Sequence, residues 1–182
     1  MAMYLGNKKV AVTNTIEKQV PSMKAFFEAE GKCQGSTATS FEGCWQYSDT
    51  ENVTDMNNMF YNCINLTNVP LFDTKNVKNM VSMFYNCKNL ANVPLFDTSN
   101  VTDMSYMFNG CSSLEQIHMI NINANLDISA STKFTREALL EIIGNLKAQT
   151  SGSKKLTIGA TNLAKLTDED KAIATSKGWT LA

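Results

Sequence analysis

The amino-acid sequence predicts an α/β solenoid, a short array of 24-residue strand/helix units with a parallel sheet, an N-terminal cap and a C-terminal α/β cap. The first observation behind this prediction is a tandem repeat: the segment at 52–75 recurs at 76–99 and, in decayed form, at 100–122. The second is that each copy keeps the same apolar spacing. The predicted boundaries are 1–44 for the N-terminal cap, 45–122 for the array and 123–182 for the C-terminal cap.

The first half of each unit has the apolar spacing of a helix. In the first unit the apolar residues at i, i+3, i+6, i+7 and i+10 are Val53, Met56, Met59, Phe60 and Cys63. This spacing places them on one face of a helix about three turns long. We therefore expect a helix at the start of every unit.

The second half of each unit has the spacing of a strand. Leu66, Val69 and Leu71 form the pattern L-x-x-L-x-L, which is the strand half of a leucine-rich repeat. The Asp-Thr-x-Asn sequences at 73–76 and 97–100 are turn sequences that link each strand to the next unit. The array is therefore predicted to be a short leucine-rich-repeat array.

One unit cannot bury its own apolar face, so the units are expected to stack. Equivalent residues then form ladders at the strand spacing of about 4.8 Å. The predicted ladders are Met59, Met83 and Met107; Phe60, Phe84 and Phe108; Cys63, Cys87 and Cys111; and Leu66, Leu90 and Leu114.

The segments on both sides of the array are predicted to cap its ends. Before it we expect a strand at 10–12, a short helix at 22–31 and a degenerate starting unit at 45–50. After it, the pattern predicts a helix at 135–146, a strand at 156–158, a helix at 167–177 that Gly178 ends, and a last strand at 179–181. The polar run at 149–153 reads as a loop, and 121–125 as the boundary between array and cap.

Composition excludes several classes of function. The formal net charge of −1 gives no general attraction to nucleic acid or to anionic membranes. The first ten residues contain no continuous apolar stretch, so neither a signal peptide nor membrane insertion is expected. Five cysteines are an odd number for a disulfide framework, and the three ladder cysteines are predicted to be buried free thiols. Whether Cys33 and Cys44 pair is left open.

Neither catalysis nor a cofactor is expected. The chain has a single histidine, His118, and no nucleophile with a recognisable base and orienting group. His118 takes the place of Pro70 and Pro94 in the repeat, so we interpret it as a solvent-facing position. The recurring Asp49, Asp73 and Asp97 lie in turns without glycine, which favours capping of turn N–H groups over a metal site.

The alternation of the strand predicts a ligand-binding face. If Val69 and Leu71 point into the core, the intervening side chains point to the opposite, concave face. The candidate ligand-binding residues are Asn68, Pro70, Phe72, Asn92, Pro94, Phe96, Gln116 and His118. Two alternatives stay open, because proline removes a ladder N–H from the strand and the two phenylalanines could instead turn inward beneath the Asp-Thr turn.

The pattern Met-Phe-x-x-Cys-x-x-Leu-x-x-Val at 59–69 and 83–93, with isoleucine last at 107–117, resembles the signature of BspA-like leucine-rich-repeat proteins. The stretch 96–104 is similar to a related repeat of bacterial surface proteins, so that the resemblance covers about 45–122. It implies adhesion without catalysis, with a protein or glycan on a cell surface as partner.

The chain ends show a second resemblance. The segments 3–13 and 166–180 are similar to terminal segments of phage and prophage tail-associated proteins of gut Gram-positive bacteria. This resemblance implies a virion location as the alternative to the cell surface, and a structural part of a tail as the alternative function. A tail-associated chain could also form an oligomer.

Overall fold

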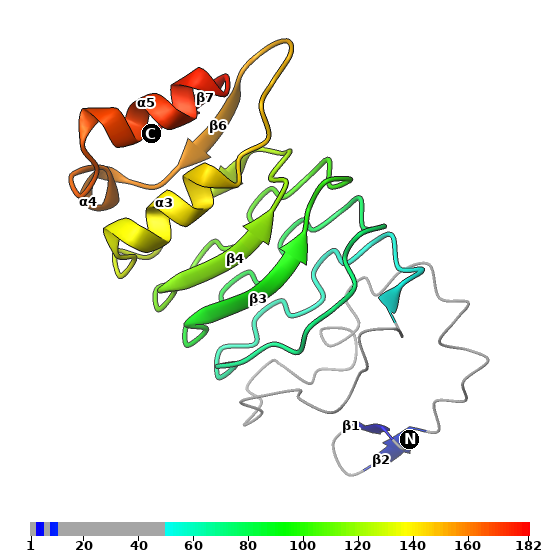
Figure 1. Ribbon diagram of the computed structural model, residues 1–182. Coiled ribbons are helices and arrows are strands. Elements are labelled where there is room, and N and C mark those ends of the chain that lie inside the picture. The colour runs from blue at the N-terminus through cyan, green and yellow to red at the C-terminus, as the bar shows by residue number, and fades with distance from the viewer. Residues whose placement is uncertain (1–2, 6–7, 11–49) are drawn as a thin grey trace.

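The computed structural model describes residues 3–5, 8–10 and 50–182 (Figure 1). Strands β1 (Met3–Leu5) and β2 (Lys8–Val10) pair antiparallel. The predicted strand at 10–12 overlaps β2 at its first residue. The predicted helix at 22–31, the starting unit up to residue 49, Cys33, Cys44 and Asp49 lie outside the described residues.

The three repeat units stack on one another in parallel. Asp55, Asn79 and Asp103 are bridged in sequence, each to the residue at the equivalent position of the next unit. The hydroxyl of Thr102 donates to the carbonyl of Lys78, which lies 24 residues earlier. Figure 1 shows the units as successive layers that lead from the N-terminal side to the C-terminal cap. Each unit therefore covers the apolar side of its neighbour.

The prediction of a helix in the first half of each unit is wrong. Residues 53–63, and their equivalents 77–87 and 101–111, form consecutive turns, which we call the turn segments. In the first unit Met59 N–H bonds the carbonyl of Met56, and Cys63 N–H bonds that of Phe60. The third residues of these turns, Asn58 and Asn62, have φ of 55° and 61°. Asparagine tolerates this left-handed conformation better than most residues, whereas a helix requires negative φ.

Backbone bonds between units explain why turns replace a helix. The N–H groups of Met56, Asn58 and Phe60 donate to carbonyls of the second unit at 2.8–2.9 Å. In a helix these groups would be consumed within the same unit. The turn segment buries the same apolar residues and also joins the units, which a row of helices could not do through its backbone.

Strands β3 (Asn92–Asp97) and β4 (Gln116–Ile120) pair in parallel, with Val93 opposite Ile117. The register then slips, because Phe96 lies opposite Met119. The corresponding segment of the first unit, 68–73, forms no strand and has only an isolated bridge at Asn68, so the parallel sheet predicted for the array does not extend to Val69. Pro70 lacks the N–H that a ladder requires, and Pro94 lies within the irregular part of β3.

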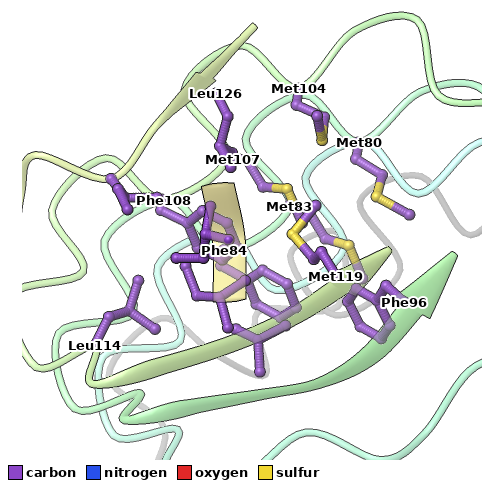
Figure 2. Packing of buried hydrophobic residues seen from close by; sticks show 14 of the residues in the cluster. Met80, Met83, Phe84, Phe96, Met104, Met107, Phe108, Leu114, Met119 and Leu126 are labelled. Carbon is purple, nitrogen blue, oxygen red and sulfur yellow. The ribbon is translucent and has the colours of Figure 1, made fainter. Parts of the chain in front are cut away.

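The core consists of the stacked ladders. All the ladder residues named above are buried, with at most 3% of their surface exposed. The rings of Phe60, Phe84 and Phe108 stack with centroids 5.4 and 5.7 Å apart and planes within 5°. Figure 2 shows the methionines packed beside this stack, above the strands. Repetition therefore produces one continuous core from short segments.

The threonine and aspartate side chains of the Asp-Thr-x-Asn turns make hydrogen bonds within the array. The buried hydroxyls of Thr74 and Thr98 donate to the carbonyls of Asp97 and Ile120 in the next unit. Asp97 Oδ1 accepts from Ser99 N at 2.9 Å and from Asn121 Nδ2 at 3.2 Å. Burial would raise the pKa of the Asp97 carboxyl, but these hydrogen bonds together outweigh it and the pKa is lowered. The Asp97 carboxylate therefore stabilises its own turn and joins that turn to the next unit.

The C-terminal cap contains a parallel sheet with the strand order β5-β6-β7. Its elements are β5 (Leu126–Asp127), α3 (Arg136–Gly144), β6 (Lys154–Thr157), α4 (Ala160–Leu163), α5 (Asp168–Ser176) and β7 (Trp179–Leu181). The two predicted helices are present, with Thr135 and Thr167 as their N-terminal caps. The short β5 and α4 were not predicted. A parallel bridge between Ile122 and Leu146 joins the array to the cap.

Asp170 connects the two long helices of the cap. Both of its oxygens accept from Arg136, at 2.7 and 2.8 Å, and Oδ2 also accepts from the N–H of Thr167 at 2.9 Å. The hydrogen bond from Arg136 is the largest cause that holds the pKa of Asp170 below its ordinary value. A carboxyl with a lowered folded pKa stabilises the fold above its unfolded pKa, and this contribution is lost as the pH falls through the folded pKa.

Asp170→Asn is therefore expected to lower the melting temperature near neutral pH. The difference from wild type should shrink once the pH falls well below about 3.9, where aspartate is protonated in the unfolded chain as well. Thermal unfolding followed by circular dichroism across this pH range measures the melting-temperature difference and its dependence on pH. Asp168→Asn is the control, because Asp168 is exposed and makes only a 3.4 Å surface pair with Lys171. A difference in melting temperature that does not change with pH would contradict the attribution of this stabilisation to the ionised Asp170 carboxylate.

Candidate ligand-binding face

The outward side of β3 and β4 contains half of the predicted ligand-binding residues: Asn92, Pro94, Gln116 and His118. Asn68, Asn92 and Gln116 are exposed on successive units, so the amide row faces solvent. Pro94 and His118 are half-buried, whereas Pro70 is buried. The structure thus brings the amide row to one surface but does not place Pro70 there.

The prediction that Phe72 and Phe96 point to the ligand is wrong. Their side chains are 1% and 0% exposed, and the centroid of Phe96 lies 6.3 Å from that of Phe84 in the core. Leu71 and Leu95 point outward instead, with 47% and 53% of their surface exposed. The inward alternative for the phenylalanines is the one that the structure adopts.

In the second unit, a bulge in β3 places Phe96 inside and Leu95 outside. Val93 pairs with the residue 24 positions later, but Phe96 pairs with the residue 23 positions later, so β3 has one extra residue between them. Val93 and Phe96 both face inward, and Leu95 is left outside. One extra residue shifts every following side chain to the other face of a strand. The proline in the strand was the sequence signal, since proline within a sheet is confined to edges and bulges.

Five exposed residues and the half-buried His118 form a surface that we call the leucine face: Leu71, Leu95, Asn68, Asn92, Gln116 and His118. It contains no charged lysine, arginine, aspartate or glutamate side chain. Its two leucines occupy equivalent positions of adjacent units, so their apolar surface repeats in the direction of stacking.

His118 lies at one end of the leucine face. Its Nδ1 is 2.7 Å from Glu141 Oε1 of α3, and both side chains are about two-fifths exposed, 40% and 44%. The pair therefore links β4 of the array to the cap. Glu141 was missed by sequence reasoning, because nothing in the repeat indicates which residue of the cap packs beside the last strand.

The cysteine ladder contains two free thiols. Cys87 and Cys111 are free and buried, but Cys63 forms a disulfide, so the prediction of three free thiols is wrong. The free thiols also have partners that we did not expect: Cys87 Sγ donates to the carbonyl of Phe60 at 3.1 Å, and Cys111 Sγ to that of Phe84 at 2.9 Å. A serine in either place could donate to the same carbonyl, so its hydroxyl would keep a hydrogen-bond partner.

No group of three or more histidine, cysteine, aspartate or glutamate side chains in the described part of the chain could hold a metal ion. No helix among residues 50–182 or the two N-terminal strands is long and apolar enough to cross a membrane.

A protein family described as "Mycoplasma protein of unknown function, DUF285" matches residues 22–138. The chain belongs to this family. The DUF285 match includes all three repeat units and ends within α3, so most of the C-terminal cap lies beyond it. The match is compatible with the resemblance to BspA-like surface proteins, but a likeness to phage tail proteins is not shown. The chain matches no curated protein and no solved structure.

Proposed function

We propose that this chain is a non-enzymatic recognition module, a short leucine-rich-repeat solenoid that binds a protein or a glycan on a cell surface. The observation that carries the proposal is the exposure of Leu71 and Leu95 at equivalent positions of adjacent units. Large apolar side chains that are exposed together on a soluble protein commonly mark an interaction site.

The surroundings of the leucines also suit recognition. Asn92 and Gln116 supply amide donors and acceptors beside the apolar surface, and the charged Glu141 lies only at its end, next to His118. An apolar centre with polar groups around it is the usual arrangement of a protein interface. The backbone beneath the face is held by the β3–β4 pairing and by the buried Phe96, so little ordering is required on binding.

Leu95→Arg is expected to weaken attachment at least about tenfold, which is the loss of a moderate interface anchor. Asn92→Arg on the same face should have an effect in the same direction. The measurement is the binding of fluorescently labelled chain to cultured epithelial cells and to bacterial cells, with melting temperature recorded for every variant.

Ile173→Arg is the matched control, because Ile173 is an exposed apolar residue of α5, 41% exposed, away from the leucine face. Lys88→Glu, on an exposed residue after the turn segment, controls for a change of charge within the array. If Leu95→Arg melts like wild type and still attaches normally, the leucine face is not the binding surface.

The alternative is a structural component of a phage tail or similar assembly, which the resemblance of the terminal segments 3–13 and 166–180 supports. A part of a tail should assemble into trimers or larger forms, whereas a lone recognition module is expected to be a monomer. Solution mass measurement of the purified chain separates the two proposals.

A further inference from the structure

A row of alternate main-chain N–H groups in each turn segment donates to the next unit. The N–H groups of Met80, Ser82, Phe84 and Asn86 donate to carbonyls of the third unit at 2.7–3.0 Å. The carbonyls of Met80, Ser82 and Phe84 accept N–H groups of their own turns, and the carbonyl of Phe84 also accepts from Cys111 Sγ of the third unit. At these four positions the second unit therefore presents main-chain N–H donors toward the third unit, whereas the reverse bond occurs before the row, from the N–H of Thr102 to the carbonyl of Lys78.

In the third unit this row of donors has no partner. The equivalent N–H groups belong to Met104, Tyr106, Phe108 and Gly110, and none of them bonds an acceptor in the described part of the chain. Met104 and Phe108 are 1% and 0% exposed. Buried main-chain N–H groups in native proteins are almost always paired with protein, water or ligand. This end of the stack thus lacks the acceptors that the two preceding units have.

A cavity of about 380 Å³ lies beside these donors. The third unit lines it with Met104, Tyr106 and Phe108, and the cap lines it on the other side with Leu126 of β5 and Lys155 of β6. Tyr106 is 65% exposed, although the equivalent Ser82 is only 9% exposed beneath the next unit. The chain therefore leaves space where a fourth turn segment would lie.

Tyr106 also has an uncommon backbone conformation. Its φ is 59°, in the left-handed region that bulky residues rarely adopt. The stacking of the units imposes this value, since Ser82 has φ of 53° at the equivalent position. Tyr106 thus lines the cavity, and its N–H belongs to the row of donors.

We propose that this cavity binds an extended peptide segment of a partner protein, whose carbonyls accept hydrogen bonds from the N–H groups of the third unit. In the second unit the same donors bond carbonyls of alternate residues, Asp103, Ser105 and Met107. A peptide backbone presents carbonyls of alternate residues on one side, whereas sugars and nucleic acids have no such row. Addition of a peptide to an open backbone edge is a common mode of recognition. This site is separate from the leucine face.

The test uses the full chain labelled with ¹⁵N and two synthetic peptides. One peptide is residues 79–87 with serine in place of the cysteine, since the carbonyls of this segment accept from the first unit; the other is an unrelated peptide of alternating serine and valine. Both are expected to give saturable downfield shifts and slower water exchange for the amide protons of Met104, Tyr106, Phe108 and Gly110.

Ala130→Trp should weaken peptide binding at least tenfold, because Ala130 lines the cavity and a tryptophan would fill it. Ala148→Trp is the matched control on an exposed residue outside the cavity, and Lys155→Trp is a second variant in case the first fails to fold. Leu95→Arg should bind the peptides normally, which separates this site from the leucine face.

The proposal is overturned if millimolar peptide produces no saturable shift at these amides, if the shifts fall on the leucine face, or if folded Ala130→Trp and Lys155→Trp bind as wild type does. If only the 79–87 peptide binds and the chain also self-associates, the occupant is a second copy of this chain, and the proposal of a partner protein is overturned.

Discussion

Phe84→Ala is expected to lower the free energy of unfolding by about 3–5 kcal/mol, the usual cost of removing a large ring from a core. The Phe84 ring is 0% exposed and stacks between Phe60 and Phe108, at centroid distances of 5.4 and 5.7 Å. The cavity left by the substitution would interrupt the ladder in its middle, where neighbours on both sides lose contacts. Chemical denaturation with linear extrapolation measures the change.

Tyr106→Ala is the control for this prediction. Tyr106 is also an aromatic residue of a turn segment, but 65% of its surface is exposed. Its replacement should change the free energy of unfolding by no more than about 0.5 kcal/mol. A loss below about 1 kcal/mol for Phe84→Ala would show that the phenylalanine ladder is not enclosed in solution.

Cys87 and Cys111 are expected to react with thiol reagents at least about a thousandfold more slowly in the native chain than in denaturant. Their side chains are fully buried, so reaction requires opening of the stack, and a typical opening free energy of about 5 kcal/mol gives a factor of this size. Burial raises the pKa of Cys111 to about 12 and that of Cys87 well above its ordinary value. The reactive thiolate is therefore scarce at neutral pH even where access occurs.

Stopped-flow labelling of native and denatured chain, read by mass spectrometry of the peptides, measures the two rates. Cys111→Ser isolates the reaction of Cys87, and its hydroxyl can donate to the same Phe84 carbonyl that the thiol bonds. Cys63 should stay unlabelled in both states without reductant, because it is disulfide-bonded. Rapid labelling of native Cys87 would mean that the ladder is open to solvent.

The helix predicted for the turn segments illustrates where sequence reasoning reached its limit. The spacing of Val53, Met56, Met59, Phe60 and Cys63 correctly selects the buried residues, all at most 3% exposed. A row of turns with the same spacing buries the same side chains, so apolar periodicity does not distinguish the two backbones. Asparagine offered a signal: it is a poor helix former, and it occupies two left-handed positions of the first unit.

The sequence predicted only the part of the candidate site that precedes the bulge in β3. The amide row of Asn68, Asn92 and Gln116 precedes the bulge, where simple alternation still holds. Beyond Pro94 the extra residue reverses the faces, which exchanges Leu95 for Phe96. Strand alternation alone could not locate a bulge, because the two-residue period assumes that none occurs.

The sequence by itself determined the 24-residue period, the residues that are buried and the two long helices of the cap, since each rests on local spacing or on a capping residue such as Thr167. Only the tertiary structure decided the backbone of the turn segments, the outward leucines and the open row of N–H donors at Met104, Tyr106 and Phe108. The physical reason is that main-chain hydrogen bonds between units are not encoded by any side chain. Their direction, and the place where they end, become visible only when one unit lies on the next.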